Sequence, residues 1–154
     1  MNSFILYKNG LEDNQILADW LYNYVITHRD KTIGLLSHKQ YYSDEVLLIV
    51  KNMLISNKPE LIDKARHYDI KLHNGCRVVT GNITTATSSM RGRTIDVMLL
   101  DNFNLYKPKL VKEFFCCYMP VMACRNNTEI GFILNTQEKI SKENMNYIYS
   151  VYKK

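Results

Sequence analysis

A run of four apolar residues that ends in an acid constrains this chain more than any other feature. The run is Val97-Met98-Leu99-Leu100, and Asp101 and Asn102 follow it directly. Strands that are buried on both faces of a parallel sheet read as continuous apolar runs. A polar residue just after such a strand lies at the carboxyl edge, where open α/β sheets bind their ligands. The run therefore predicts a central parallel strand that presents the Asp101 carboxylate at a water-filled edge.

Helical patterns alternate with other apolar runs along the chain. The runs at 4–7, 32–37 and 129–136 predict three more strands. Residues 13–25, 43–54, 109–122 and 141–152 predict helices, because their apolar side chains recur with a period near 3.6. Pro108 suits the first turn of the third helix. This alternation favours an α/β fold of three layers, with a mostly parallel sheet and helices on both faces.

The middle of the chain follows a different pattern. Strand-like runs at 68–72 and 76–80 flank His73-Asn74-Gly75, and Asn-Gly between two such runs is a strong hairpin signal. We expect this β-hairpin to be inserted into the parallel sheet. Residues 83–86 predict another short strand, and 87–93 predict a polar loop.

Charge and cysteine content narrow the class of protein. The net charge is +5, and residues 107–154 hold eight Lys or Arg against four Asp or Glu. This mild basic bias suits a nucleic-acid partner, although solvated surfaces would produce it equally well.

The cysteines fit neither a zinc ribbon nor a CxxC pair and are interpreted as reduced, buried thiols. No run suits a signal peptide or a membrane span, so we expect a non-secreted protein without a membrane partner. The four cysteines are Cys76, Cys116, Cys117 and Cys124.

Four stretches, taken in order, resemble the ATPase domain of large terminases, the viral motors that pump DNA into preformed capsids. They are residues 30–39 with the helix start at 43–47, the Asn-Gly hairpin at 71–78, the Thr/Ser-rich loop at 85–92, and 97–103 as the Walker B strand. Residues 133–136 then match the strand that carries the coupling motif. The resemblance spans about residues 15 to 137. It implies a P-loop NTPase-like fold, a viral origin and the host cytoplasm as location.

This chain differs most from that family in the segment that corresponds to the P-loop. Family members place Gly-Lys-Ser/Thr between the first strand and first helix, where the Lys and the loop amides hold phosphates. Residues 8–15 contain one glycine, Gly10, and the only lysine, Lys8, precedes it. Two acids stand where a polyphosphate would bind. Lys8 and Gly10 are therefore interpreted as a vestigial Walker A region.

The Walker B and coupling motifs differ as well. Asp101 remains as the candidate Mg²⁺ ligand, but Asn102 replaces the catalytic Glu of the family, and an amide cannot take a proton from water. The coupling strand ends in Asn-Thr-Gln rather than a Thr/Ser-rich run. We interpret Asp101 and Asn102 as a vestigial Walker B motif, and we expect no ATP or Mg²⁺ cofactor.

These observations predict one degenerate terminase-like ATPase domain over residues 1–154, without a nuclease domain. Our first hypothesis is a non-catalytic viral protein that binds double-stranded DNA weakly or binds a packaging partner. One alternative is the active ATPase piece of a split large terminase, which would use ATP and Mg²⁺. The other is an interaction module that reuses the fold to bind an unrelated protein. The candidate DNA-binding residues are Arg91, Arg93, Lys107, Lys109 and Lys112.

Overall fold

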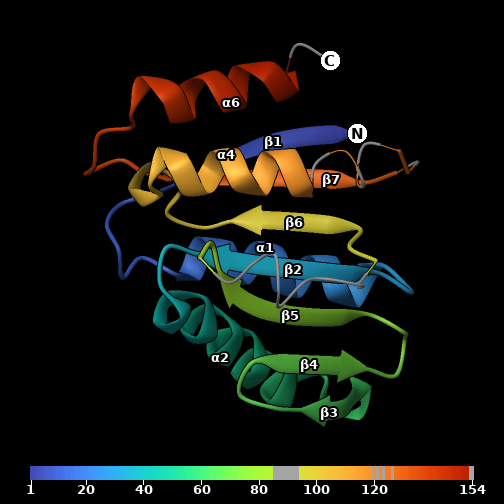
Figure 1. Ribbon diagram of the computed structural model, residues 1–154. Coiled ribbons are helices and arrows are strands. Elements are labelled where there is room, and N and C mark those ends of the chain that lie inside the picture. The colour runs from blue at the N-terminus through green and yellow to red at the C-terminus, as the bar shows by residue number, and fades with distance from the viewer. Residues whose placement is uncertain (85–93, 119, 121, 123, 126, 153–154) are drawn as a thin grey trace.

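The apolar run that ends at Asp101 forms a strand near the middle of a mixed sheet (Figure 1). The computed structural model describes residues 1–84, 94–118, 120, 122, 124–125 and 127–152. Within these residues, seven strands follow the order β1-β7-β6-β2-β5-β4-β3. The first five in that order are parallel, and β4 and β3 are antiparallel to their neighbours. The strands are β1 (Asn2–Lys8), β2 (Thr32–Ser37), β3 (Ile62–Ala65), β4 (Asp69–Leu72), β5 (Arg77–Asn82), β6 (Val97–Leu100) and β7 (Glu129–Asn135).

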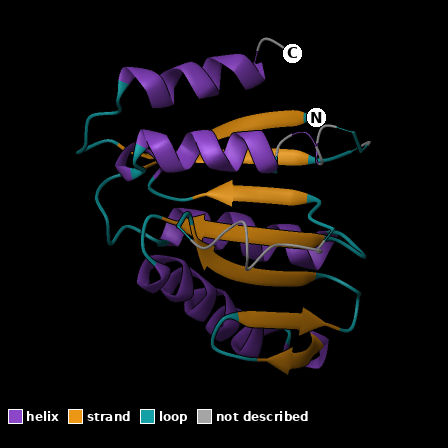
Figure 2. Ribbon diagram, in the orientation of Figure 1, coloured by secondary structure: helices purple, strands orange, loops and turns teal. Residues whose placement is uncertain are grey.

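Helices cover both faces of the sheet, as the alternating pattern predicted (Figure 2). Side chains of β6 alternate between two apolar clusters: Val97 and Leu99 belong to the cluster with α1 and α2, and Met98 and Leu100 to the one with α4 and α6. All four are buried, so β6 is the doubly buried strand that the sequence indicated. The three-layer α/β class is confirmed. The helices are α1 (Gln15–Thr27), α2 (Gln40–Asn57), α4 (Pro108–Cys117) and α6 (Lys142–Tyr152), with short 3₁₀ turns η1 (Pro59–Leu61) and η2 (Phe103–Leu105).

The predicted Asn-Gly turn joins β4 to β5. Gly75 has φ +88°, a conformation that suits glycine, and the Asn74 amide donates to the Val25 carbonyl at 2.7 Å, which ties the turn to α1. β5 itself pairs in parallel with β2, so it belongs to the main sheet. β4 pairs with β5 in antiparallel fashion across this turn, so the predicted hairpin is confirmed, and β3 adds a second antiparallel partner to β4. The sequence did not predict β3, because only Ile62 in that strand is even partly buried.

Two other boundaries differ from the predicted ones. α2 begins at Gln40, three residues before the expected start at Ser43. Ser43 is buried inside the helix instead, and its hydroxyl donates to the carbonyls of Gln40 and Gly81, which joins α2 to β5. Ile83 and Thr84 follow β5 outside any strand, and the rest of the expected strand at 83–86 lies outside the described residues.

The prediction that all four thiols are buried was wrong. Cys76 is buried, but Cys116, Cys117 and Cys124 are exposed. The apolar stripe of α4 passes through Val111 and Phe114, which are buried, so Cys116 and Cys117 face away from the core. All four are free, as expected.

Among the helices of the described residues, none is long and apolar enough to cross a membrane.

Candidate functional site

Several buried polar side chains gather at the carboxyl edge of the parallel strands. β1 ends in Lys8, β2 ends in Ser37, and Asp101 and Asn102 follow β6. Figure 1 shows β2 and β6 ending on the same side of the sheet. Open α/β sheets bind ligands at this edge. Here, however, each of these four side chains is at most 2% exposed.

The Lys8 ammonium group lies at the centre of this cluster. Its Nζ atom donates to the Leu11 carbonyl at 3.1 Å, to Asn14 Oδ1 at 3.0 Å and to Asp101 Oδ1 at 3.4 Å. An ammonium group has three protons to donate, so the chain itself supplies one oxygen for each. Asn14 in turn donates to Glu45 of α2 at 3.3 Å, which connects the cluster to the next helix.

Asp101 is fully buried, not exposed to water at an open edge as the sequence suggested. Burial raises the pKa of its carboxyl group from 3.8 to about 6, and the charge and hydrogen bond of Lys8 offset part of that rise. The sequence placed Asp101 at the correct end of the correct strand. It could not reveal that Lys8, 93 positions away, fills the space beside it.

Asn102 has a structural role that its residue type explains. Its backbone is left-handed, with φ 53° and ψ 42°, a conformation that asparagine tolerates better than most residues. Its amide group donates to Ser37 Oγ and to Asp101 Oδ2, both at 3.3 Å. Its Oδ1 atom is buried without a hydrogen-bond partner among the described residues. An amide held in this way orients Asp101 but supplies no base.

The loop between β1 and α1 satisfies several of its own amide groups. The Asn9 amide donates to the Asp13 carboxylate at 2.8 Å, and those of Asp13 and Asn14 donate to carbonyls of the same loop. In a phosphate-binding loop such amides point at the ligand. Gly10, with φ +118°, permits the turn. Here the Leu11 carbonyl points at Lys8, so this segment surrounds a cation, where a P-loop surrounds an anion.

The side chains present do not fit a Mg²⁺–nucleotide complex. Mg²⁺ takes oxygen ligands in near-octahedral geometry. At the carboxyl ends of the parallel strands that the structure describes, Asp101 is the one carboxylate. One of its oxygens accepts from Lys8 and the other from Asn102. Across the described ranges, no group of three His, Cys, Asp or Glu side chains is placed to hold a metal ion.

The remaining predicted residues do not join this cluster. Lys107, Lys109 and Lys112 are exposed at the start of α4. Arg91 and Arg93 lie outside the described residues. Asn14, Ser37 and Glu45 belong to the cluster but were not singled out from the sequence. The position of Ser37 directly after an apolar run was the signal that could have found it.

The chain has the fold of the ATPase domains of large terminases. It matches the large terminase of bacteriophage HK97 with a TM-score of 0.73 and 11% identity, over 99% of this chain and 33% of that one. It matches the ATPase domain of the Thermus phage P74-26 large terminase with a TM-score of 0.59 and 10% identity, over 92% and 62%. A third large terminase, from a thermophilic bacteriophage and in complex with ADP, gives a TM-score of 0.60 and 13% identity, over 86% and 33%.

These matches confirm the fold that the four sequence stretches suggested. The chain spans about a third of the length of the HK97 terminase and of the terminase in complex with ADP. No protein-family model and no curated protein matches the sequence.

Proposed function

We propose that this chain is a non-catalytic, terminase-like viral protein that binds DNA or a packaging partner. The proposal rests chiefly on Lys8, because its buried ammonium group pairs with the acid that corresponds to the Walker B position. The resemblance expects Mg²⁺ beside this acid, and in this chain the Lys8 ammonium group lies beside it. Nucleotide chemistry at this edge would require Lys8 to leave a site that already satisfies its three donors.

Two further observations support a pseudo-ATPase. The β1–α1 loop has no Gly-Lys-Ser/Thr sequence and directs a carbonyl inward. The resemblance expects a general base directly after Asp101, and this chain has Asn102 there, with its amide group donating to Ser37 and Asp101. One large terminase of the same fold, from a thermophilic bacteriophage, forms a complex with ADP. In this chain three oxygen acceptors surround the Lys8 ammonium group at the corresponding edge.

The first prediction is that the purified chain hydrolyses ATP only at background rate in the presence of Mg²⁺. A general base typically contributes about 10²–10⁴-fold, and the phosphate cradle is altered independently. Asn102→Glu is therefore expected to remain inactive. Phosphate release and equilibrium binding of a fluorescent ATP analogue measure the two properties separately.

A clear result would overturn this proposal. Turnover of about 1 s⁻¹ that Asp101→Ala abolishes would identify the active ATPase of a split terminase. Activity gained by Asn102→Glu alone would mean that residues 8–15 bind nucleotide despite their sequence. In either case Lys8 would have to move away from Asp101.

A further inference from the structure

One part of the sheet surface, far from the Lys8 cluster, collects positive charge. Strands β3, β4 and β5 turn the side chains of Lys64, Lys71 and Arg77 to the face that carries Val79, the side of α4 and α6. Lys64 and Lys71 are exposed, and the Arg77 side chain is 38% exposed. These three cations are therefore open to solvent.

The strand register places three cations in a row. Lys64 is the cross-strand partner of Lys71, and Lys71 is the partner of Arg77. Like charges directly opposite one another destabilise a sheet. Within the described part of the chain, Lys64 and Lys71 form no ion pair with an acid. Repulsion between the three cations opposes folding. Such a row is expected at a site where a bound anion offsets that repulsion.

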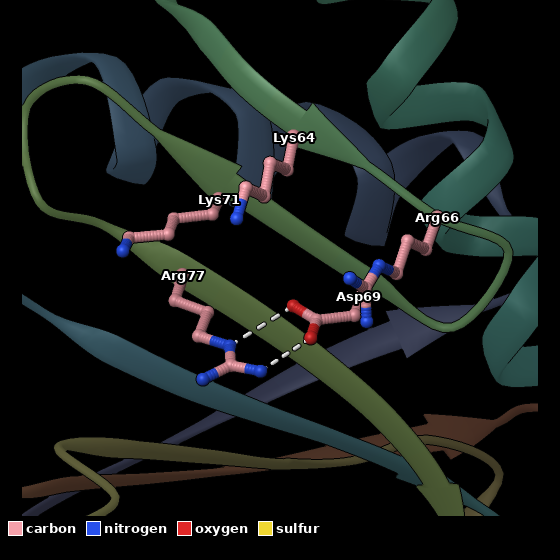
Figure 3. A pocket seen from close by; sticks show the side chains of 5 residues that line it. All are labelled: Lys64, Arg66, Asp69, Lys71 and Arg77. Carbon is pink, nitrogen blue, oxygen red and sulfur yellow. Dashed lines mark hydrogen bonds and ion pairs between the residues drawn. The ribbon is translucent and has the colours of Figure 1, made fainter.

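The row borders a small pocket of about 160 Å³ lined only by charged residues (Figure 3). Arg77 is fixed there by Asp69, which accepts from its Nε at 3.0 Å and from its Nη2. Arg66 closes the pocket from the end of β3. One carboxylate thus holds one guanidinium in place, and three further cations stand around it: Lys64, Arg66 and Lys71.

We propose that this pocket binds phosphate groups of the duplex DNA backbone. The inference deepens the proposed DNA-binding function by assigning a surface to it. Sequence-independent binding to DNA relies on Lys and Arg at phosphates, and the pocket consists of these residues with one positioning carboxylate. Protein partners bind through buried aromatic and apolar anchors in well-packed pockets. The lining here offers no apolar side chain for such an anchor, so DNA fits it better than an acidic protein does.

Fluorescence anisotropy with a labelled duplex of about 20 base pairs, titrated with salt, tests the proposal. The variant is Lys64→Ala/Lys71→Ala, and the charge-matched control is Lys139→Ala/Lys142→Ala, two exposed lysines near the other edge of the sheet. Each phosphate contact contributes about 0.9 to the log–log salt slope. The pocket variant is expected to lower that slope by about 1 to 2 and the affinity at least tenfold at about 50 mM salt. The control should retain wild-type affinity.

A charge-preserving variant and a second surface complete the design. Lys64→Arg/Lys71→Arg keeps both positive charges and should therefore keep the affinity for DNA. If the two side chains only supported the structure of the hairpin, their charge would not matter for DNA binding. If Lys107→Ala/Lys109→Ala/Lys112→Ala loses binding and the pocket variant does not, the pocket assignment is wrong while DNA binding stands. Equal loss in the pocket variant and its control also overturns the assignment. No duplex binding by the wild-type chain, or tighter binding to poly-glutamate than to DNA, overturns it together with the DNA part of the proposed function.

Discussion

At the scale of single residues, the pair of Lys8 and Asp101 determines what the sheet edge can do. Both side chains are buried, at 2% and 0% exposure, and their charges are 3.4 Å apart. Breaking a buried ion pair leaves one charge without a partner in a poorly solvated place, which typically destabilises by about 3–5 kcal/mol. Replacing both members by apolar residues of similar volume is often nearly neutral.

The second prediction follows from this difference. Lys8→Met should lower the free energy of unfolding by about 3–5 kcal/mol, and Lys8→Met/Asp101→Leu should recover most of the loss. Urea denaturation of the two variants and of Asp101→Leu alone gives the coupling energy. Lys58→Met, at an exposed lysine, is the control and should change little. Additive effects of the two single substitutions would show that the pair is not coupled.

The titration of Asp101 gives a third prediction. Burial raises the pKa of its carboxyl group from 3.8 to about 6. Between these values the folded protein binds more protons than the unfolded chain, so this group makes stability fall as the pH rises. One pKa unit corresponds to about 1.4 kcal/mol, so the loss is about 3 kcal/mol between about pH 4 and pH 7.

Asp101→Asn isolates this effect, because the amide does not titrate. The difference in unfolding free energy, wild type minus variant, should decrease from about pH 4 to about pH 7. Urea denaturation at several pH values measures it, and other carboxylates cancel in the difference. A difference that grows with pH would mean that Lys8 lowers the pKa of Asp101 below its ordinary value.

The sequence predicted the position of the site residues along the sheet edge but not the surroundings of their side chains. A polar residue after an apolar run was enough to place Asp101 and Asn102 at the carboxyl edge. The protonation and exposure of Asp101 depend on which side chain fills the space beside it, and Lys8 comes from a strand 93 residues earlier. The pocket of Lys64, Lys71 and Arg77 was missed for a similar reason. Those residues become neighbours only through the register of three strands.

At the scale of elements, β6 is the strand on which the layers depend. It pairs with β2 on one side and β7 on the other, and Leu99 is fully buried against the cluster of α1 and α2. Truncating a buried leucine removes apolar contacts and leaves a cavity, which typically destabilises by about 2–5 kcal/mol.

The fourth prediction is that Leu99→Ala lowers the free energy of unfolding by about 2–5 kcal/mol. Leu48→Ala is the matched control, because Leu48 is 55% exposed on α2 and should change stability by less than about 0.5 kcal/mol. Thermal and urea denaturation of both variants provide the comparison. Equal losses would mean that β6 is not the doubly buried strand described here.

The elements that could be predicted are those with strong periodicity. β6 and β7 are almost entirely buried and read as apolar runs, and the Asn-Gly dipeptide marked its turn. β3 has no such signal, since it forms an edge and three of its four residues are exposed. α2 begins at Gln40 and not at Ser43. Ser43 resembles a helix cap in the sequence, but its hydroxyl donates to the carbonyl of Gly81 in β5. Edges and boundaries follow from tertiary contacts that a local pattern does not contain.

At the scale of the whole molecule, stability should fall along the strand order from the centre to the antiparallel edge. β2 and β6 lie inside the sheet and are almost wholly buried, whereas β3 is a short edge strand with one partly buried residue. Local opening of a native protein ranges from nearly no free energy at frayed edges to the global value in the core. That global value is about 5–15 kcal/mol for an ordinary domain. The cation row across β3, β4 and β5 should lower the opening energy of that edge further, because like charges oppose one another there.

The fifth prediction is therefore a gradient of amide hydrogen exchange across the sheet. Amides of β6 and β2 should exchange only through global unfolding, those of β5 at an intermediate rate, and those of β3 fastest. Native-state exchange followed by NMR at increasing low concentrations of urea resolves these classes. Leu99→Ala provides the internal check: it should accelerate exchange in β6 and β2 by the factor that its loss of global stability implies, and leave β3 unchanged, since β3 opens without the core. Exchange in β3 as slow as in β6, or an equal acceleration of both by Leu99→Ala, would mean that the hairpin and the parallel sheet unfold as one cooperative unit. In that case the charged edge is held as firmly as the core.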